Sequence, residues 1–251
     1  MALLELRGLH KRFGGLHAVN DVSFGVERGL IKAVIGPNGA GKTTLFNLIT
    51  GTVPASGGQV LFAESDISRK KPHQIASLGL ARTFQNIKLF SDMSVLENVM
   101  VGLHVRSRTG FIGSMLRMPA GRREERRLRV QALQLLDRLG LSDFADCEAT
   151  SLAFGQQRAV ELARAMALQP SLLLLDEPAA GLNIYETAEV GRLISSIREQ
   201  GVTVLLVEHD MSLVMDISDE VVVLSFGKKI AEDVPQSIQQ NDEVIRVYLG
   251  E

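Results

Sequence analysis

The sequence predicts an α/β fold in which a mainly parallel sheet is built from two segments separated by an all-helical insert. Short apolar runs of strand length alternate with helical segments before residue 86 and again after Pro170. Between these regions the strand signals disappear, and apolar residues recur at helical spacing. Because strand–helix alternation is typical of a parallel sheet covered by helices, we expect one such sheet formed by both segments.

The first segment begins with three predicted strands. Residues 3–9 alternate loosely between apolar and polar and lead through residues 11–13 into the turn Gly14-Gly15. Residues 19–26 and 30–35 are further strand candidates, and the second enters a glycine-rich loop. The next predicted elements are a helix over residues 42–50 with Gly51 just past its end, a strand at 59–62, a helix at 72–78 and a strand at 81–84.

The insert is marked by an apolar stripe at helical spacing. Leu128, Ala132, Leu135 and Leu139 fall at i, i+4, i+7 and i+11. Residues 107–121 are rich in Gly, Ser, Arg and Met, which predicts a loop. Strand signals return at residues 172–175, 202–207 and 221–224, with a helix over 185–199. We therefore expect a discontinuous core of residues 1–86 and 161–251 and a helical subdomain of residues 87–160.

Composition and charge narrow the function classes. The chain has 251 residues, of which 45% are hydrophobic and 22% charged, as is typical of a folded soluble protein. The net charge of -2, without a dense basic patch, argues against a nucleic-acid partner. The single cysteine, Cys147, excludes an internal disulfide and suits a reducing compartment. No segment approaches the roughly 20 apolar residues of a membrane-spanning helix, and residues 122–127 predict a solvated helix face in preference to a lipid-binding patch.

Residues 36–43 match the pattern G-x-x-x-x-G-K-[ST], which describes a phosphate-binding loop. Its glycines, Gly36, Gly39 and Gly41, allow backbone N–H groups to converge on phosphate oxygens where a Cβ would clash. The helix beginning at Lys42 adds the positive end of its dipole, and the Lys42 side chain adds a charge for the β- and γ-phosphates. The Thr43 hydroxyl is placed to ligate Mg²⁺. Since a Val/Ile strand precedes the motif and a helix follows, nucleotide binding is favoured over a plain glycine turn.

Two adjacent acidic residues end the apolar run at residues 172–175. Asp176 is expected to hold Mg²⁺ through water, and Glu177, whose side chain points elsewhere, can polarise an attacking water molecule. An isolated Asp-Glu pair after a strand is usually a solvated turn. Together with the upstream phosphate-binding loop, however, the pair indicates a nucleotide hydrolase.

A third motif, Leu152-Ala-Phe-Gly-Gln-Gln-Arg158, resembles the L-S-G-G-Q-Q-R signature of ABC transporter ATP-binding subunits. The resemblance implies a P-loop ABC ATPase with a mainly parallel sheet core, an antiparallel β region near the N-terminus and an all-helical inserted subdomain. It also implies that Ala153, Gly155 and Gln156 face the γ-phosphate bound by the opposite subunit. Here Ala153 replaces the usual serine, which removes a hydroxyl contact, and Phe154 replaces a glycine.

Further positions fit the same family in order. Phe13 stands where an aromatic residue stacks on adenine, and Val19 where a small apolar residue flanks it. Gln85 resembles the glutamine that joins Mg²⁺ and the attacking water to the insert, and His209 resembles the histidine that contacts the γ-phosphate. Asn183 stands where the family usually has aspartate.

The site implied by the motifs and the resemblance has three parts. The catalytic residues are Glu177, His209 and Gln85, and the Mg²⁺ ligands are Thr43, Gln85 and Asp176. The ATP-contacting residues are Phe13, Val19, Gly36, Pro37, Asn38, Gly39, Ala40, Gly41, Lys42, Thr43, Thr44, Ala153, Gly155 and Gln156.

The residues at the individual positions of these motifs, and the C-terminal residues 244–251, resemble those of the ATPases of branched-chain amino acid importers. This resemblance implies a peripheral subunit on the cytoplasmic face of the inner membrane that hydrolyses ATP to drive uptake through two permease subunits. A second ATPase subunit, either a homologous chain or a copy, would complete an ATP-sandwich dimer. A periplasmic or extracellular amino acid-binding protein would belong to the same system. Ile87, Leu89, Phe90 and residues 95–101 are expected to receive a short permease helix, with Leu96 and Val99 in the insert core.

Two other functions are compatible with the same motifs. A soluble ABC ATPase of iron–sulfur cluster assembly has similar length, and it would bind a scaffold protein in place of a permease. An ATP-dependent binding module with slow hydrolysis is favoured by Ala153 and Asn183, whereas Glu177 and His209 argue against it. The sequence leaves the cargo and the choice between homodimer and heterodimer open.

Overall fold

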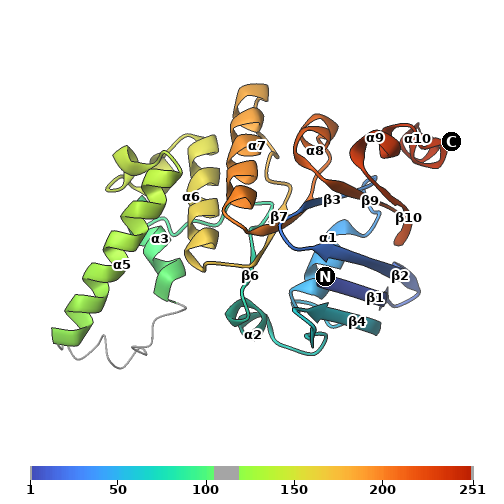
Figure 1. Ribbon diagram of the computed structural model, residues 1–251, viewed down its shortest axis with the longest axis horizontal. Coiled ribbons are helices and arrows are strands. Elements are labelled where there is room, and N and C mark those ends of the chain that lie inside the picture. The colour runs from blue at the N-terminus through green and yellow to red at the C-terminus, as the bar shows by residue number, and fades with distance from the viewer. Residues whose placement is uncertain (1, 105–118, 250–251) are drawn as a thin grey trace. The chain divides into compact units, whose positions relative to one another are not determined.

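The computed structural model describes residues 2–104 and 119–249 (Figure 1). The chain divides into two compact units, Met1–Gln85 with Ser171–Glu251, and Asn86–Pro170. We call the first the sheet unit and the second the helical unit. The helical unit ends ten residues later than the expected boundary at residue 160, because helix α6 runs without interruption over Phe154–Ala167.

The sheet unit contains two sheets. One is antiparallel, with strand order β2-β1-β4-β5; its strands are β1 (Ala2–Phe13), β2 (Leu16–Glu27), β4 (Gly57–Phe62) and β5 (Ser65–Asp66). The other has the order β10-β9-β3-β8-β7-β6; its strands are β3 (Ile31–Ile35), β6 (Leu80–Arg82), β7 (Leu172–Asp176), β8 (Thr203–Val207), β9 (Glu220–Ser225) and β10 (Lys228–Asp233). All neighbours in this sheet are parallel except β9 and β10. The predicted fold class, a mainly parallel sheet with an antiparallel region near the N-terminus, is confirmed.

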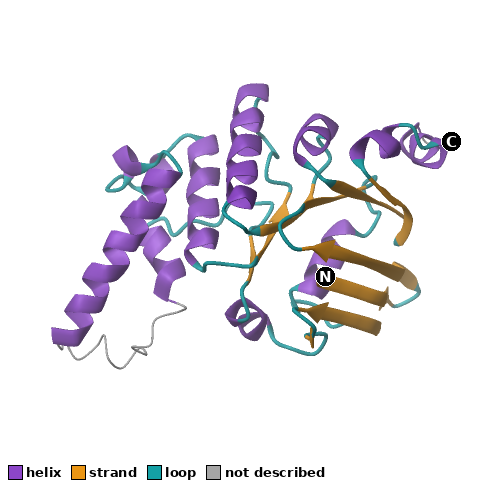
Figure 2. Ribbon diagram, viewed as in Figure 1, coloured by secondary structure: helices purple, strands orange, loops and turns teal. Residues whose placement is uncertain are grey.

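Along the chain, the helices of the sheet unit either connect these strands or follow the last one, β10 (Figure 2). They are α1 (Lys42–Ile49), α2 (Pro72–Ser77), α7 (Ile184–Glu199), α8 (Met211–Ile217), α9 (Pro235–Gln239) and α10 (Asp242–Leu249). The helices predicted over residues 42–50, 72–78 and 185–199 agree with α1, α2 and α7 to within one residue. The strand predicted at residues 81–84 ends earlier, at Arg82, and the chain after Leu224 forms β10, α9 and α10, for which no elements were predicted.

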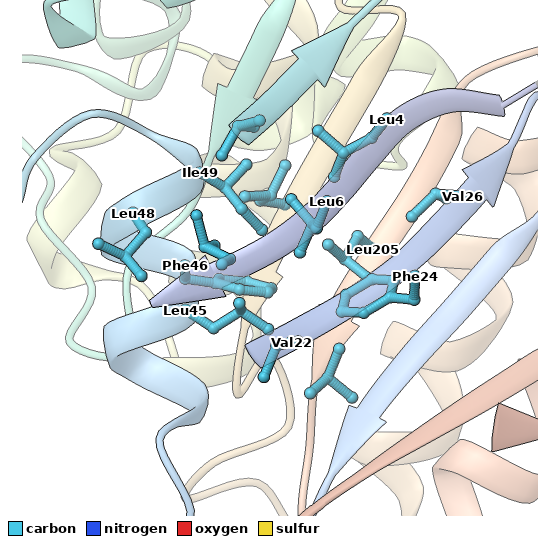
Figure 3. Close-up of a cluster of buried hydrophobic side chains, with 14 of the residues drawn as sticks. Leu4, Leu6, Val22, Phe24, Val26, Leu45, Phe46, Leu48, Ile49 and Leu205 are labelled. Atoms are coloured by element: carbon cyan, nitrogen blue, oxygen red, sulfur yellow. The ribbon is translucent and has the colours of Figure 1, made fainter. Parts of the chain in front are cut away.

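Helix α1 lies in the apolar core between the two sheets. Its buried residues Leu45, Phe46, Leu48 and Ile49 belong to one hydrophobic cluster with residues of both sheets. Figure 3 shows this packing, with Leu4, Leu6, Val22, Phe24 and Val26 of the antiparallel sheet and Leu205 of β8. Covering both sides of α1 explains why a helix of only eight residues is stable, since packing supplies what length does not. The first turn of α1 is thereby fixed beside the end of β3.

The helical unit is formed by α3 (Val95–His104), α5 (Pro119–Arg138) and α6, with short 3₁₀ turns at Ser142–Phe144 and Ala149–Ser151. Its core contains Leu128 and Ala132 of the predicted stripe, and Leu136 is buried beside them. Leu96 and Val99 lie in this core as expected. Helices α3 and α6 approach closely at Gly102, where an added Cβ would lie 2.4 Å from the backbone oxygen of Arg164.

Two further expectations concern a loop of the helical unit and membrane-spanning helices in the whole chain. The loop expected at residues 107–121 falls largely outside the described residues, although residues 119–121 already belong to α5. Within the described residues, no helix is long and apolar enough to cross a membrane.

Candidate functional site

Three parallel strands end at one edge of the larger sheet and bring the predicted site residues together. Val34 of β3 and Asp176 of β7 both pair with Val207 of the central strand β8. The phosphate-binding loop, Glu177 and the pair Glu208-His209 directly follow these strands. Because the carboxyl ends of parallel strands meet at the same edge, residues separated by more than a hundred positions become neighbours.

The phosphate-binding loop requires glycine for two reasons at once. Gly36 and Gly41 have φ values of 146° and 103°, which side chains rarely adopt. A Cβ would lie 2.1 Å from the Leu224 carbonyl oxygen at Gly36 and 2.4 Å from that of Ala18 at Gly41. Gly41 is also the N-cap of α1, and no side chain caps this helix. The N–H groups of its first turn therefore stay available for an anion.

Lys42 is folded into the loop. Its Nζ donates hydrogen bonds to the carbonyl oxygens of Gly36, at 2.6 Å, and Pro37, at 3.1 Å. Burial lowers the pKa of Lys42, whereas the charges of Glu177 and Asp176 oppose that shift. The ammonium thus lies within the loop and near both carboxylates, where it complements the charge of a phosphate group.

A cavity of about 570 Å³ opens above the loop. Residues 38–44 and Glu177 line it, so the phosphate-binding loop and the second residue of the acidic pair face the same space. Gly36 and Pro37 are not among the lining residues, and their carbonyl oxygens hold Lys42. The Thr43 side chain is exposed toward solvent.

Asp176 forms a buried ion pair that the sequence analysis missed. Its Oδ2 accepts a hydrogen bond of 2.8 Å from Nη2 of Arg82, and both side chains are less than 10% exposed. The other terminal nitrogen of Arg82 donates to Asn47 Oδ1 at 2.8 Å and Thr50 Oγ1 at 3.2 Å. Arg82 therefore links the carboxylate at the end of β7 to helix α1. A buried Asp at a strand end needs a cation, but only the pairing of β6 with β7 identifies it as Arg82.

The three residues predicted to be catalytic lie close together. Gln85 Nε2 donates a hydrogen bond of 2.6 Å to Glu177 Oε2, and His209 Nδ1 lies 3.8 Å from the same oxygen. Glu177 adopts a left-handed conformation with φ 49°, which is uncommon for a residue with a Cβ. Its backbone N–H donates to Val207 O at 2.9 Å, which fixes this turn to the end of β8.

A second carboxylate organises the backbone around these residues. Glu208 is fully buried, and its Oε1 accepts the Ala179 N–H at 2.8 Å. Its Oε2 accepts the N–H groups of His209 at 2.8 Å and Asp210 at 3.2 Å. Glu208 thus ties the loop after Glu177 to the loop that carries His209. The sequence shows an acidic residue next to His209, which could have indicated a role at the site. The three backbone N–H groups that Glu208 accepts can be identified only from the fold.

The two residues predicted to hold the adenine ring are placed differently. Phe13 is about half exposed and lines the cavity, with Lys11 Nζ 4.9 Å from its ring centroid. Val19 has no exposed surface and belongs to the apolar core, so the structure contradicts its expected place beside the ring. The cavity is lined by the neighbouring Ala18 instead, because successive residues of β2 point to opposite faces.

The geometry of this edge agrees with comparisons to known proteins. A model of the family described as ABC transporter matches residues 19–180, more than half of the chain. The chain belongs to the ABC transporter family. It is 47% identical to the high-affinity branched-chain amino acid transport ATP-binding protein BraF of Pseudomonas aeruginosa and 45% identical to LivG of Escherichia coli, in both cases over 99% of this chain and 98% of the relative. It is also 35% identical to the lipopolysaccharide export ATP-binding protein LptB of Escherichia coli, over 100% of this chain and 98% of that protein.

Solved structures lead to the same family. A nucleotide-free ATP-binding cassette from an ABC transporter superposes with a TM-score of 0.87 at 31% identity, covering 100% of both chains. The ADP conformation of an ATP-binding cassette gives the same TM-score at 32% identity and the same coverage. A model described as branched-chain amino acid ATP-binding cassette transporter matches residues 228–251. The chain is thus an ATP-hydrolysing cassette.

The signature residues of the cassette begin helix α6 in the helical unit. Ala153 is the N-cap, and its N–H is accepted by Gln156 Oε1 at 3.1 Å. No side chain caps the N–H groups of the first turn. Phe154 is 45% exposed, whereas Arg158 is fully buried and paired with Glu161 at 2.6 Å. The helix start therefore presents uncapped backbone donors.

Asn183, which replaces the usual aspartate of the cassette family, keeps a structural role. Its Oδ1 accepts the N–H groups of Tyr185 at 2.9 Å and Glu186 at 3.1 Å, and it is the N-cap of α7. Glu186 Oε2 accepts the Asn183 N–H at 2.9 Å and completes a capping box. Asparagine and aspartate cap helices about equally well, so the exchange preserves the start of α7.

The C-terminal helix α10 carries a tyrosine whose surroundings shift its pKa. Burial raises the pKa of Tyr248, and the backbone of Gly36 partly opposes the shift. This effect was missed because no element was predicted after Leu224.

Proposed function

We propose that this cassette binds ATP with Mg²⁺ at the edge of its larger sheet and powers the import of branched-chain amino acids through separate membrane permeases. The observation that carries the proposal is the convergence of the phosphate-binding loop, Asp176 and the group Glu177, Gln85 and His209 at one edge. The cargo is proposed from BraF and LivG, whose names describe branched-chain amino acid transport, and from the match at residues 228–251.

The donor set of the site fits a magnesium-bound nucleotide. The exposed Thr43 hydroxyl, the Asp176 carboxylate and the Gln85 amide offer the oxygen ligands that Mg²⁺ prefers. When bound, the cation would neutralise charge on the phosphates. Lys42 and the uncapped start of α1 supply the protein's own positive charge for the same groups.

Glu177 orients the attacking water. Its Oε2 faces both Gln85 and His209, so one carboxylate oxygen is fixed while the side chain remains at the wall of the cavity. His209 is more than half exposed and can turn toward the γ-phosphate. Phosphoryl transfer depends mainly on positioning and charge stabilisation, which these groups provide.

Two ATPase subunits would complete each nucleotide site. Residues 36–43 of one chain would face residues 152–156 of the other, where the start of α6 offers uncapped N–H groups. The missing hydroxyl at Ala153 leaves the backbone at Gly155 and Gln156 as the phosphate contact. The second subunit is a homologous chain or a copy of this one.

The permease would dock on the segment around Phe90, at the cytoplasmic face of the membrane. Phe90 is 47% exposed, and its ring lies 5.6 Å from the guanidinium carbon of Arg164. The buried Asn98 side chain holds the Phe90 backbone, accepting its N–H at 2.9 Å and donating to its carbonyl oxygen at 3.1 Å. An exposed aromatic ring on a fixed backbone suits a short apolar helix of a permease. An amino acid-binding protein outside the cell would deliver the cargo.

Purification of the tagged cassette from native membranes in mild detergent tests the proposal. We expect two multi-span permeases and a second ATPase to co-purify, and Phe90→Asp to abolish ATP-dependent transport while ATP binding is retained. Recovery with soluble scaffold proteins and no permease would instead support the iron–sulfur assembly alternative. Transport by the Phe90→Asp variant at the wild-type rate would exclude this segment as the docking site.

A further inference from the structure

The turn between β9 and β10 carries an unexpected residue. Ser225 and Lys228 pair across this hairpin, which leaves Phe226 and Gly227 as its two turn residues. Their φ values are 45° and 77°, the left-handed pair typical of a type I′ turn. Asn-Gly is the favoured sequence there, and a bulky side chain at the first position is disfavoured.

The fold gains little packing from Phe226. Its side chain is 90% exposed, whereas the aromatic rings of Phe46 and Phe62 are buried. A residue that strains the backbone and leaves its ring in solvent calls for a role outside folding. An Asn or Gly would form the same hairpin with less strain.

The position of this turn is nevertheless fixed with respect to the phosphate-binding loop. The N–H of Gly227 donates to Ala40 O at 3.0 Å, and its carbonyl oxygen accepts the Asn20 N–H at 2.7 Å. Gly227 also packs closely, since an added Cβ would lie 2.9 Å from Ala18 O. The Phe226 ring is therefore attached to a turn that is hydrogen-bonded to both the loop and β2.

Phe226 lines the same cavity as the phosphate-binding loop. Two other exposed apolar side chains line it as well, Phe13 at 49% and Leu16 at 67% exposure. Lys11 lies over the Phe13 ring and is itself held by Pro54 O at 2.8 Å. The cavity thus combines an apolar, partly aromatic rim with a cationic, N–H-rich base. A ligand with a flat aromatic end and a polyanionic end fits both parts.

We propose that Phe226 is a second aromatic residue of the base site, which contacts the purine ring of the nucleotide whose phosphates bind the loop. The inference rests on the proposed function and adds a base-contacting residue from the β9–β10 turn to the expected contact with Phe13. Stacking on an aromatic ring uses the π-face that every base has. Phe226 therefore raises affinity for nucleotides without selecting strongly among bases, and it leaves phosphate binding unchanged.

Calorimetric titration of ATP, ADP and inorganic tripolyphosphate separates these contributions. We expect Phe226→Asn to weaken ATP and ADP binding by about 5- to 100-fold, the range of one lost stacking contact, and to leave tripolyphosphate binding unchanged. Its thermal midpoint should equal or exceed that of the wild type, because Asn suits the turn. The matched control is Leu78→Asn, which removes an exposed apolar side chain from the same unit outside the lining of this cavity and should bind ATP as the wild type does.

A tryptophan variant gives a second readout. The chain contains no tryptophan, so Phe226→Trp introduces a single fluorophore, and the wild type serves as the blank. We expect this variant to bind ATP within about twofold of the wild type, since a larger ring preserves stacking. ATP should change its emission, whereas tripolyphosphate should not.

Unchanged ATP affinity in Phe226→Asn would overturn the inference, as would an equal loss for ATP and tripolyphosphate, which would indicate a disturbed phosphate-binding loop. The Lys42→Ala variant tests nucleotide binding at the loop separately from the base contact of Phe226. If Lys42→Ala abolishes ATP binding while Phe226→Asn does not affect it, only this inference fails; if neither affects it, nucleotide binding at the loop fails as well.

Discussion

The ion pair between Arg82 and Asp176 gives a prediction about stability that can be worked out from the structure. Replacing Arg82 with Met removes the 2.8 Å hydrogen bond to Asp176, whose side chain is 6% exposed, and the hydrogen bonds to Asn47 and Thr50. Breaking a buried pair by removing one partner typically costs about 3 to 5 kcal/mol, because the other charge stays buried without compensation.

Two features place the expected loss of folding free energy in Arg82→Met near the lower end of that range. The Lys42 ammonium is close enough to interact with Asp176 and remains as a partial counter-charge. The Nε of Arg82 has no hydrogen-bond partner among the described residues, so the wild-type pair is itself imperfect. We therefore expect Arg82→Met to lower the free energy of unfolding by about 3 kcal/mol.

Urea unfolding followed by circular dichroism measures this change, with the m-value checked for constancy. Arg192→Met is the matched control, because its ion pair with Glu189 is 3.9 Å long and 73% exposed on both sides. Such a surface pair is worth about 0 to 1 kcal/mol. A loss below about 1 kcal/mol for Arg82→Met would refute the reasoning, since Asp176 would then not depend on Arg82.

Three further predictions concern the same sheet unit. Glu177→Gln should retain ATP binding and lose nearly all ATP turnover, because an amide cannot polarise the attacking water; a phosphate-release assay beside a binding titration measures both. Glu208→Gln should lower both thermal stability and turnover, since the amide of Gln must face one of the three backbone N–H groups that Glu208 accepts. Glu232 makes a contribution to the free energy of unfolding that depends on pH. Burial opposes ionisation, but hydrogen bonds from Lys229 and Lys32 outweigh it and lower the pKa of Glu232 below its ordinary 4.5. The stability difference between the wild type and Glu232→Gln should therefore be constant above that value and shrink as pH falls through the folded-state pKa.

Each of these predictions has an outcome that contradicts it. Turnover by Glu177→Gln at more than about a tenth of the wild-type rate would exclude Glu177 as the residue that activates water. Wild-type stability of Glu208→Gln would show that the three N–H contacts are dispensable. A difference for Glu232→Gln that stays constant down to acidic pH would contradict the lowered pKa.

The features that the sequence predicted well are those set by local geometry. The phosphate-binding loop before α1 has a backbone conformation that only glycine accommodates, and the buried strand β7 follows from a run of four leucines. Glu177 and Gln85 were expected to serve one site, and the structure places them 2.6 Å apart. Their roles remain a prediction.

The missed features depend on contacts between distant segments. Arg82 and Asp176 are separated by 94 positions and meet only because β6 and β7 are neighbours. The cavity is lined by Ala18, although Val19 was predicted there. The two positions differ by one residue along β2, and because side chains of a strand alternate between its faces, that difference moves Val19 into the core.

Uptake of labelled leucine by proteoliposomes that contain the cassette, its co-purified permeases and the amino acid-binding protein tests the central claim most directly. We predict uptake that requires ATP inside the vesicles with the cassette and that stops when Glu177→Gln replaces the wild type, although this variant still binds ATP. Leucine uptake that continues with Glu177→Gln, or ATP hydrolysis without any leucine uptake by the wild-type assembly, would contradict the account.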